Sequence, residues 1–111
     1  MNRLFSLTIL LIGLILPSSL AAEPSDIAAA SRSVVRVVLI QRDYYGDRLV
    51  GHGSGFAVAP NLIITNAHVI NPMGSNTQIV AGVVPSQGKG GSWAQVIAVD
   101  NRADLALLKV T

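Results

Sequence analysis

The residues of this sequence that could carry chemistry lie in four segments. They are, in chain order, Gly53-Ser54-Gly55-Phe56, the run from Leu62 to Val69 with its histidine, Asp100, and the run from Ala103 to Val110 with its aspartate. A histidine can take up and return a proton near neutral pH because its unperturbed pKa is about 6.5. A carboxylate beside it can hold the second ring nitrogen and stabilise the imidazolium. A serine hydroxyl needs such a base before it can act as a nucleophile.

Composition argues against other kinds of site. The chain has no cysteine, which excludes disulfides, thiolate catalysis and Cys-ligated zinc. Its two histidines, His52 and His68, lie far apart in sequence and lack metal-ligand spacing, so we expect neither a metal nor a cofactor. The net charge is only +2 and the basic residues are well separated, so no nucleic-acid partner is expected.

The N-terminus predicts export. Arg3 precedes a short apolar run that ends at Pro17, and small residues follow, so residues 1–21 are expected to be a signal peptide cleaved after Ala21 or Ala22. The run is too short for an ordinary membrane span, which needs about 20 apolar residues. The mature protein, residues 22–111, is therefore expected to be periplasmic or secreted, in contact with the membrane only through the signal peptide. An uncleaved segment would make it a membrane-anchored scaffold instead.

The rest of the chain predicts an all-β domain. A short helix is expected from Ser25 or Asp26 to Ala30, with no second helix after it. Six short strands separated by turn residues follow, which favours a six-stranded antiparallel barrel over a parallel sheet. These strands are expected at Val34–Ile40, Val50–Ala59, Leu62–Thr65, Gln78–Val84, Trp93–Val99 and Leu105–Val110.

The second expected strand has an unusual alternation. Its odd positions are all glycine or alanine, from Gly51 to Ala59, whereas its even positions carry side chains such as Phe56. One face of the strand is therefore nearly bare. Glycines weaken a strand, so this pattern predicts sharp coiling or a close approach of backbones, as at the corner of a barrel.

The four segments in this order resemble the N-terminal barrel of trypsin-like serine proteases. In the cysteine-free bacterial HtrA-like branch, a Gly-Ser-Gly-Phe strand leads to Thr-Asn-x-His-Val, and an acidic residue later precedes Leu-Ala-Leu-Leu-Lys-Val. The resemblance covers about Ser33 to Thr111. Animal trypsins place a cysteine directly after the histidine, and Val69 at that position favours the bacterial branch.

This resemblance implies roles for individual residues. His68 corresponds to the catalytic base, and Asp104 corresponds to the carboxylate that orients it. Asp100 is the competing carboxylate, but an aspartate at that earlier position in the family commonly ends the strand and caps the turn. His52 is expected to be an ordinary polar residue.

Neither candidate serine fits the family's nucleophile. Ser54 belongs to the second strand, remote from the expected nucleophile turn, and Ser92 lacks the following glycines of Gly-x-Ser-Gly-Gly, whose N–H groups form the oxyanion hole. The resemblance places the nucleophile, the oxyanion hole and the specificity pocket in a second barrel, which would begin where Thr111 ends this sequence.

The leading hypothesis is therefore a serine endopeptidase represented by its first barrel, inactive by itself, with protein or peptide substrates. It could also associate with other molecules through the face that normally packs on the second barrel. A second hypothesis is a short exported β-barrel that binds a partner and has no catalytic activity.

Overall fold

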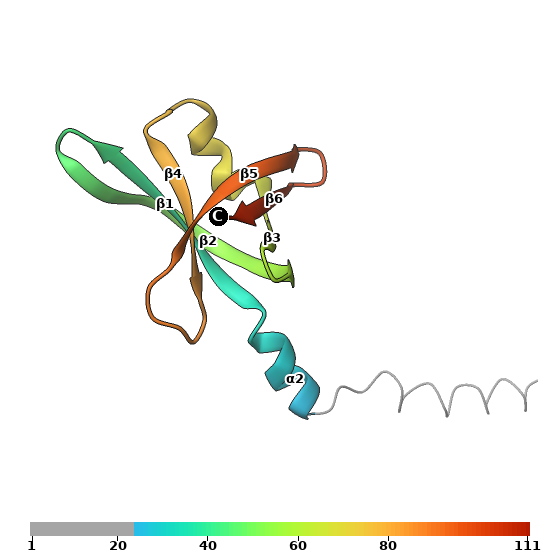
Figure 1. Ribbon diagram of the computed structural model, residues 1–111. Coiled ribbons are helices and arrows are strands. Elements are labelled where there is room, and N and C mark those ends of the chain that lie inside the picture. Colours follow the sequence, from blue (N-terminus) through green and yellow to red (C-terminus); the bar gives the residue numbers. More distant parts are fainter. Residues whose placement is uncertain (1–23) are drawn as a thin grey trace, which may run out of the picture.

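The computed structural model describes residues 24–111, so the expected signal peptide lies outside the described residues. The first described element is helix α2 (Pro24–Ser31), which buries no residue and extends away from the rest of the domain (Figure 1). It begins slightly earlier than expected because Pro24, with its fixed φ and no N–H to satisfy, suits the first turn of a helix. Within residues 24–111 no helix has the length and apolarity required to cross a bilayer.

The domain is the all-β, closed six-stranded antiparallel barrel that the sequence predicted. Its strands are β1 (Val34–Asp43), β2 (Gly46–Ala59), β3 (Leu62–Thr65), β4 (Ile79–Pro85), β5 (Ser92–Asp100) and β6 (Leu105–Val110). They are hydrogen-bonded in the order β1-β2-β3-β6-β5-β4, and β4 pairs with β1 to close the barrel. The pairing of β3 with β6 brings together two segments distant in sequence (Figure 1).

Alternate residues of the strands fill the barrel. Since successive side chains of a strand point to opposite faces, one residue in two faces inward. Val37, Leu39 and Leu108 are fully buried, each with 0% exposure. The remaining buried apolar residues of the core are Val35, Ile63, Ile70, Ile79, Ala81, Val83 and Ala106.

The bare face of β2 is the one that faces this core. A Cβ on Gly55 would lie 2.7 Å from Ile63 Cγ2 and 3.0 Å from Val37 Cγ2, which is too close for a side chain. A Cβ on Gly53 would lie 2.5 Å from Val69 Cγ2. The nearest atoms at both glycines belong to side chains, so the glycines make room for side chains from neighbouring elements rather than for the expected approach of another backbone.

Two expectations about local structure were wrong. The first concerns strand ends: β1 continues beyond the expected end at Ile40, and β2 begins before Val50, so that the two strands run almost to the tip of a hairpin. There Asp43 Oδ1 accepts the N–H of Tyr45 at 2.9 Å, and Gly46 takes a φ of 111° that favours glycine. Cross-strand pairs of opposite charge, including Arg42 with Asp47 at 3.2 Å, line the extension.

The second error concerns helices after α2. A one-turn helix, α3 (Ala67–Ile70), follows β3, and a 3-10 helix, η1 (Asn71–Gly74), follows it directly. Ala67 and Ile70 are buried against the barrel, so tertiary packing stabilises a turn that is too short to be evident from sequence.

We predict that Gly53→Ala lowers the free energy of unfolding by about 1–3 kcal/mol, because the added methyl group would overpack the contact with Val69. Urea unfolding of the purified chain measures this. Val69→Ala should relieve the clash, so the double variant should lose less stability than the sum of the two single variants. Gly74→Ala is the control, because a Cβ there has no atom within 4 Å. Equal losses for Gly53→Ala and Gly74→Ala would contradict the close packing at Gly53.

Candidate active site

His68 projects from the barrel on helix α3. Asn66 is the N-cap of this helix, with an extended backbone (φ −86°, ψ 144°), and the helix turns directly after β3. Ala67 and Ile70 anchor α3 in the core and Val69 packs against it, whereas His68 points away from it. The side chain of His68 is accordingly 69% exposed.

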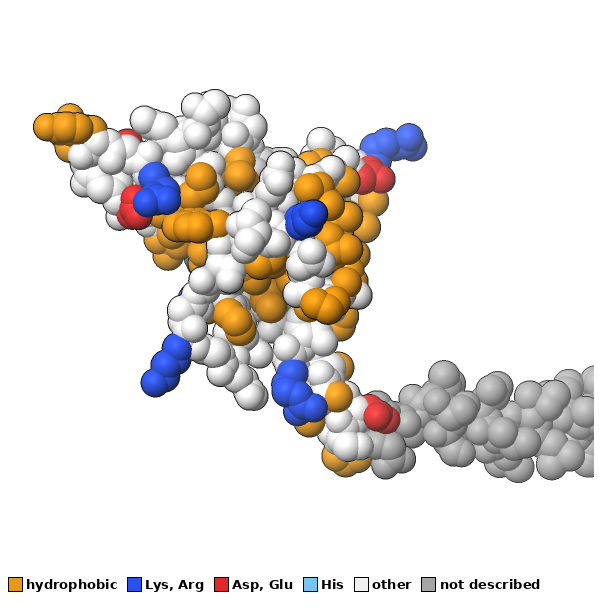
Figure 2. Space-filling model, viewed as in Figure 1, with side chains coloured by type: hydrophobic (Ala, Val, Ile, Leu, Met, Phe, Trp, Pro, Cys, Tyr) orange, Lys and Arg blue, Asp and Glu red, His pale blue; other side chains and the backbone are white. Residues whose placement is uncertain are grey.

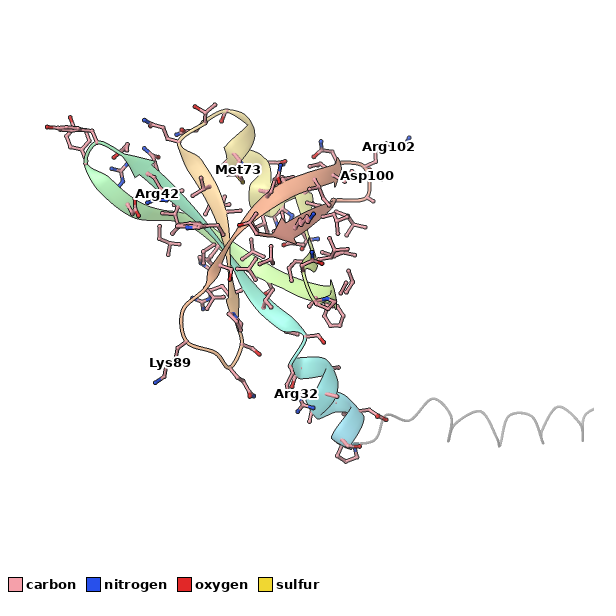
Figure 3. The ribbon with its side chains drawn as sticks, in the orientation of Figure 1. Arg32, Arg42, Met73, Lys89, Asp100 and Arg102 are labelled. Atoms are coloured by element: carbon pink, nitrogen blue, oxygen red, sulfur yellow. The ribbon has the colours of Figure 1, made fainter. Side chains whose placement is uncertain are left out.

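Asp104 is placed by the turn between β5 and β6. Asp100 ends β5, and its Oδ1 accepts the N–H groups of Arg102 at 3.0 Å and Ala103 at 3.1 Å. Figure 3 shows Asp100 and Arg102 at this connection. The N–H of Asp104 then donates to the carbonyl oxygen of Asn101 at 3.3 Å. Asp100 therefore shapes the turn that carries Asp104, as the resemblance to trypsin-like proteases implied.

The antiparallel pairing of β3 with β6 brings the two residues together. Thr65 is the registered partner of Ala106, so the residues that follow β3 lie beside those that precede β6. Across this junction His68 Nδ1 lies 2.7 Å from Asp104 Oδ2. The backbone N–H of His68 donates to the other carboxylate oxygen, Oδ1, at 2.8 Å. The carboxylate thus holds both the ring and the main chain of the same residue.

These contacts determine which ring nitrogen is free. The backbone N–H of His68, and then its ring, lower the pKa of the Asp104 carboxyl below its ordinary value. The group is therefore ionised at neutral pH, and an ionised carboxylate can only accept hydrogen bonds. Nδ1 must then carry the proton in the contact with Oδ2, which leaves Nε2 of a neutral His68 ring as the acceptor.

Two neighbouring side chains support the junction and were not singled out from the sequence. The hydroxyl of Thr65, which is 4% exposed, donates to the carbonyl oxygen of Ser54 at 2.7 Å. Asn66 Nδ2 donates to the backbone oxygen of Asp104 at 3.0 Å. Both residues lie in the segment before His68, which was the available sequence signal, but their partners depend on strand pairing.

The other candidate residues lie outside this contact. Ser92 begins β5 opposite Val83, and His52 is exposed on β2 opposite Val38. Ser54 lies on β2 next to the registered pair Gly55 and Thr65. In the described part of the chain, no serine or threonine hydroxyl forms a hydrogen bond with His68. Residues 24–111 also contain no group of three side chains placed to hold a metal ion.

An apolar surface borders the site. Val34, Phe56, Ile64 and Leu107 are registered partners on four successive neighbouring strands, so their side chains share the outer face of the barrel. We call these four residues, with Leu105, the outer apolar face. Val34 is 40% exposed, and Phe56 and Leu105 are each 45% exposed. Figure 2 shows hydrophobic side chains gathered over the side of the barrel where β3, β5 and β6 lie.

Comparison with known proteins identifies the family of the domain. The sequence profile of the trypsin-like peptidase domain matches residues 53–111, more than half of the chain, including both His68 and Asp104. The chain belongs to the trypsin-like peptidase family. The resemblance to trypsin-like serine proteases that the sequence motifs indicated is therefore confirmed. No curated protein sequence matches the chain.

Solved structures agree with this family. The barrel is similar to the crystal structure of the active form of the Rv3671c protease from M. tuberculosis, with 27% sequence identity and a TM-score of 0.56. The match covers 76% of this chain but only 33% of that protease. This member of the trypsin-like peptidase family thus spans about a third of the length of the protease it matches.

We predict that the Asp104 carboxyl titrates below the ordinary aspartate value of about 3.9 in the folded chain. Since the folded-state pKa is lowered, the contribution of this carboxylate to stability is present above the unfolded pKa. It is lost as the pH falls through the folded pKa. Carbon-13 NMR of the side-chain carboxyl resonance measures the titration.

His68→Ala is the informative variant for this measurement. It removes the ring contact but leaves the backbone N–H that bonds Oδ1, so the pKa of Asp104 should rise only part of the way. A wild-type pKa at or above 3.9 would contradict the described geometry.

Proposed function

We propose that this chain supplies the general base, His68, and its orienting carboxylate, Asp104, to a serine endopeptidase. The observation that carries the proposal is the pair of contacts from one carboxylate to His68, at 2.7 Å to the ring and 2.8 Å to the backbone. This arrangement holds the ring with Nδ1 occupied and Nε2 available. A base for a serine hydroxyl requires that state.

The proposed reaction is hydrolysis of peptide bonds in two acyl-transfer steps. Nε2 of His68 takes the proton of a serine hydroxyl while the serine oxygen attacks the substrate carbonyl, and Asp104 stabilises the resulting imidazolium. The imidazolium then gives this proton to the leaving amine, which frees the new N-terminus and leaves an acyl-enzyme. A water molecule releases the acyl group through the same base.

We propose that the nucleophile comes from a second barrel that packs on the outer apolar face. Monomeric soluble proteins rarely expose large contiguous apolar surfaces, so a partner for Phe56, Ile64 and Leu105 is expected. The face borders Asn66, with which these three residues line a shallow pocket, so a domain seated there would lie next to His68. The structural match covers only 33% of the Rv3671c protease, so the rest of that protease is long enough to contain such a domain.

Substrates and location follow from the same proposal. Protein or peptide chains would bind between the two barrels, where the exposed His68 ring can reach the scissile bond. The signal-peptide pattern in residues 1–21 supports a periplasmic or secreted enzyme. Neither step needs a metal or a cofactor, because the base and the serine carry the chemistry.

We predict that the 111-residue chain neither cleaves peptides nor reacts with a serine-directed fluorophosphonate. A base activates a hydroxyl only within about 2.6–3.2 Å, and no described hydroxyl forms that bond with His68. Mass spectrometry of the treated chain is the measurement. Labelling that disappears in Ser54→Ala or Ser92→Ala would place the nucleophile inside this barrel. A specific partner bound without any activity in a longer protein would favour a non-catalytic binding barrel.

In a longer protein that contains this barrel and a second one, the two proposed residues can be tested directly. His68→Ala should lower kcat by several orders of magnitude, and Asp104→Asn by an order of 10⁴, because an amide favours the wrong ring tautomer. Asp100→Asn is the matched control: it makes the same chemical change but keeps an oxygen acceptor for the turn, so it should cost far less. Full activity of His68→Ala would overturn the proposal.

A further inference from the structure

Asp104 has a backbone conformation that needs support. Its φ is 56°, and it is the one non-glycine residue among residues 24–111 with a positive φ. A residue other than glycine adopts this left-handed backbone conformation at a cost in free energy. Surrounding contacts must therefore hold Asp104 there. The conformation matters because it sets the direction in which the carboxylate leaves the main chain toward His68.

Each polar group of Asp104 has a partner. Its N–H donates to Asn101 O at 3.3 Å, and its carboxylate accepts the two bonds from His68. Its carbonyl oxygen accepts the side-chain amide of Asn66 at 3.0 Å. The bond from Asn66 comes from outside the β5–β6 turn, so it ties the turn to the segment that carries His68.

The side chain of Asn66 is not used in the usual way for its position. Asparagine is favoured at the N-cap because its oxygen accepts an N–H group of the first helical turn. Here Asn66 is the N-cap of α3 but makes no side-chain cap bond. Asp104 Oδ1 accepts the N–H of His68 in that first turn instead. The amide is thereby free to donate to Asp104, and only its nitrogen can face a carbonyl oxygen.

We propose that Asn66 is a positioning residue, whose amide fixes the left-handed main chain of Asp104 so that the carboxylate meets both the ring and the backbone of His68. Asp104 accepts both bonds of this clamp: its main-chain oxygen accepts the side-chain amide of Asn66, and its carboxylate accepts the main-chain N–H of His68. The catalytic meaning of this clamp rests on the proposed function. The clamp itself is a property of the barrel and can be tested without activity.

Amide hydrogen exchange and carboxyl titration of the 111-residue chain provide the test. In Asn66→Ala and Asn66→Ser, the His68 amide should exchange about two- to tenfold faster, as expected for the loss of one net hydrogen bond. The Asp104 carboxyl should titrate closer to its ordinary pKa. Serine is itself a good N-cap residue, so the second variant removes the amide donor while keeping a side chain suited to starting α3.

Asn101→Ser is the matched control. Asn101 lies in the same turn as Asp104, and its side chain makes no hydrogen bond in the described part of the chain, so both readouts should remain at wild-type values. Wild-type exchange at His68 and a wild-type Asp104 pKa in both Asn66 variants would overturn the proposal. If the amides throughout the barrel exchanged faster by the same factor as that of His68, the proposal would also be overturned, because Asn66 would then stabilise the whole domain and not this contact in particular. Loss of peptidase activity in a longer protein bears on the proposed function alone, since neither readout here depends on catalysis.

Discussion

The candidate site of this barrel depends on one carboxylate that holds two N–H groups of the same residue. Asp104 bonds the ring of His68 through one oxygen and its backbone through the other. A contact to the ring alone would leave the main chain of α3 free to shift, and the ring would move with it. Holding both fixes the direction of Nε2. Because a serine nucleophile needs an oriented base, the proposed function rests on this pair of bonds.

The barrel meets that requirement by close packing. Pairing of β3 with β6 brings the residue before β6 to the end of β3, and α3 then turns His68 toward it. Helix α3 can seat at the barrel because Gly53 leaves space for Val69. The glycines of β2, the short helix and the turn shaped by Asp100 are thus parts of one arrangement: Gly53 makes room for α3 through Val69, and the turn places Asp104 through hydrogen bonds.

Much of this arrangement could be predicted from the sequence. The six strands follow from β-branched runs and turn residues, and the family motifs singled out His68 and Asp104, which the structure brings into contact. Sequence could not show that the bare face of β2 points inward, since alternation does not distinguish the two faces. It also missed α3, whose single turn is stabilised by burial of Ala67 and Ile70, and the bond from Asn66, which depends on strand register.

The tautomer of the His68 ring is the most direct measure of how Asp104 orients it. Nitrogen-15 NMR of the imidazole ring, at a pH high enough for the ring to be neutral, distinguishes a protonated ring nitrogen from an unprotonated one. We expect Nδ1 to carry the proton, donated to Asp104, and Nε2 to carry none. Asp104→Asn should weaken or reverse this preference, because an amide can donate to Nδ1 instead. A proton on Nε2 in the unmodified chain would contradict the donation from Nδ1 to Asp104.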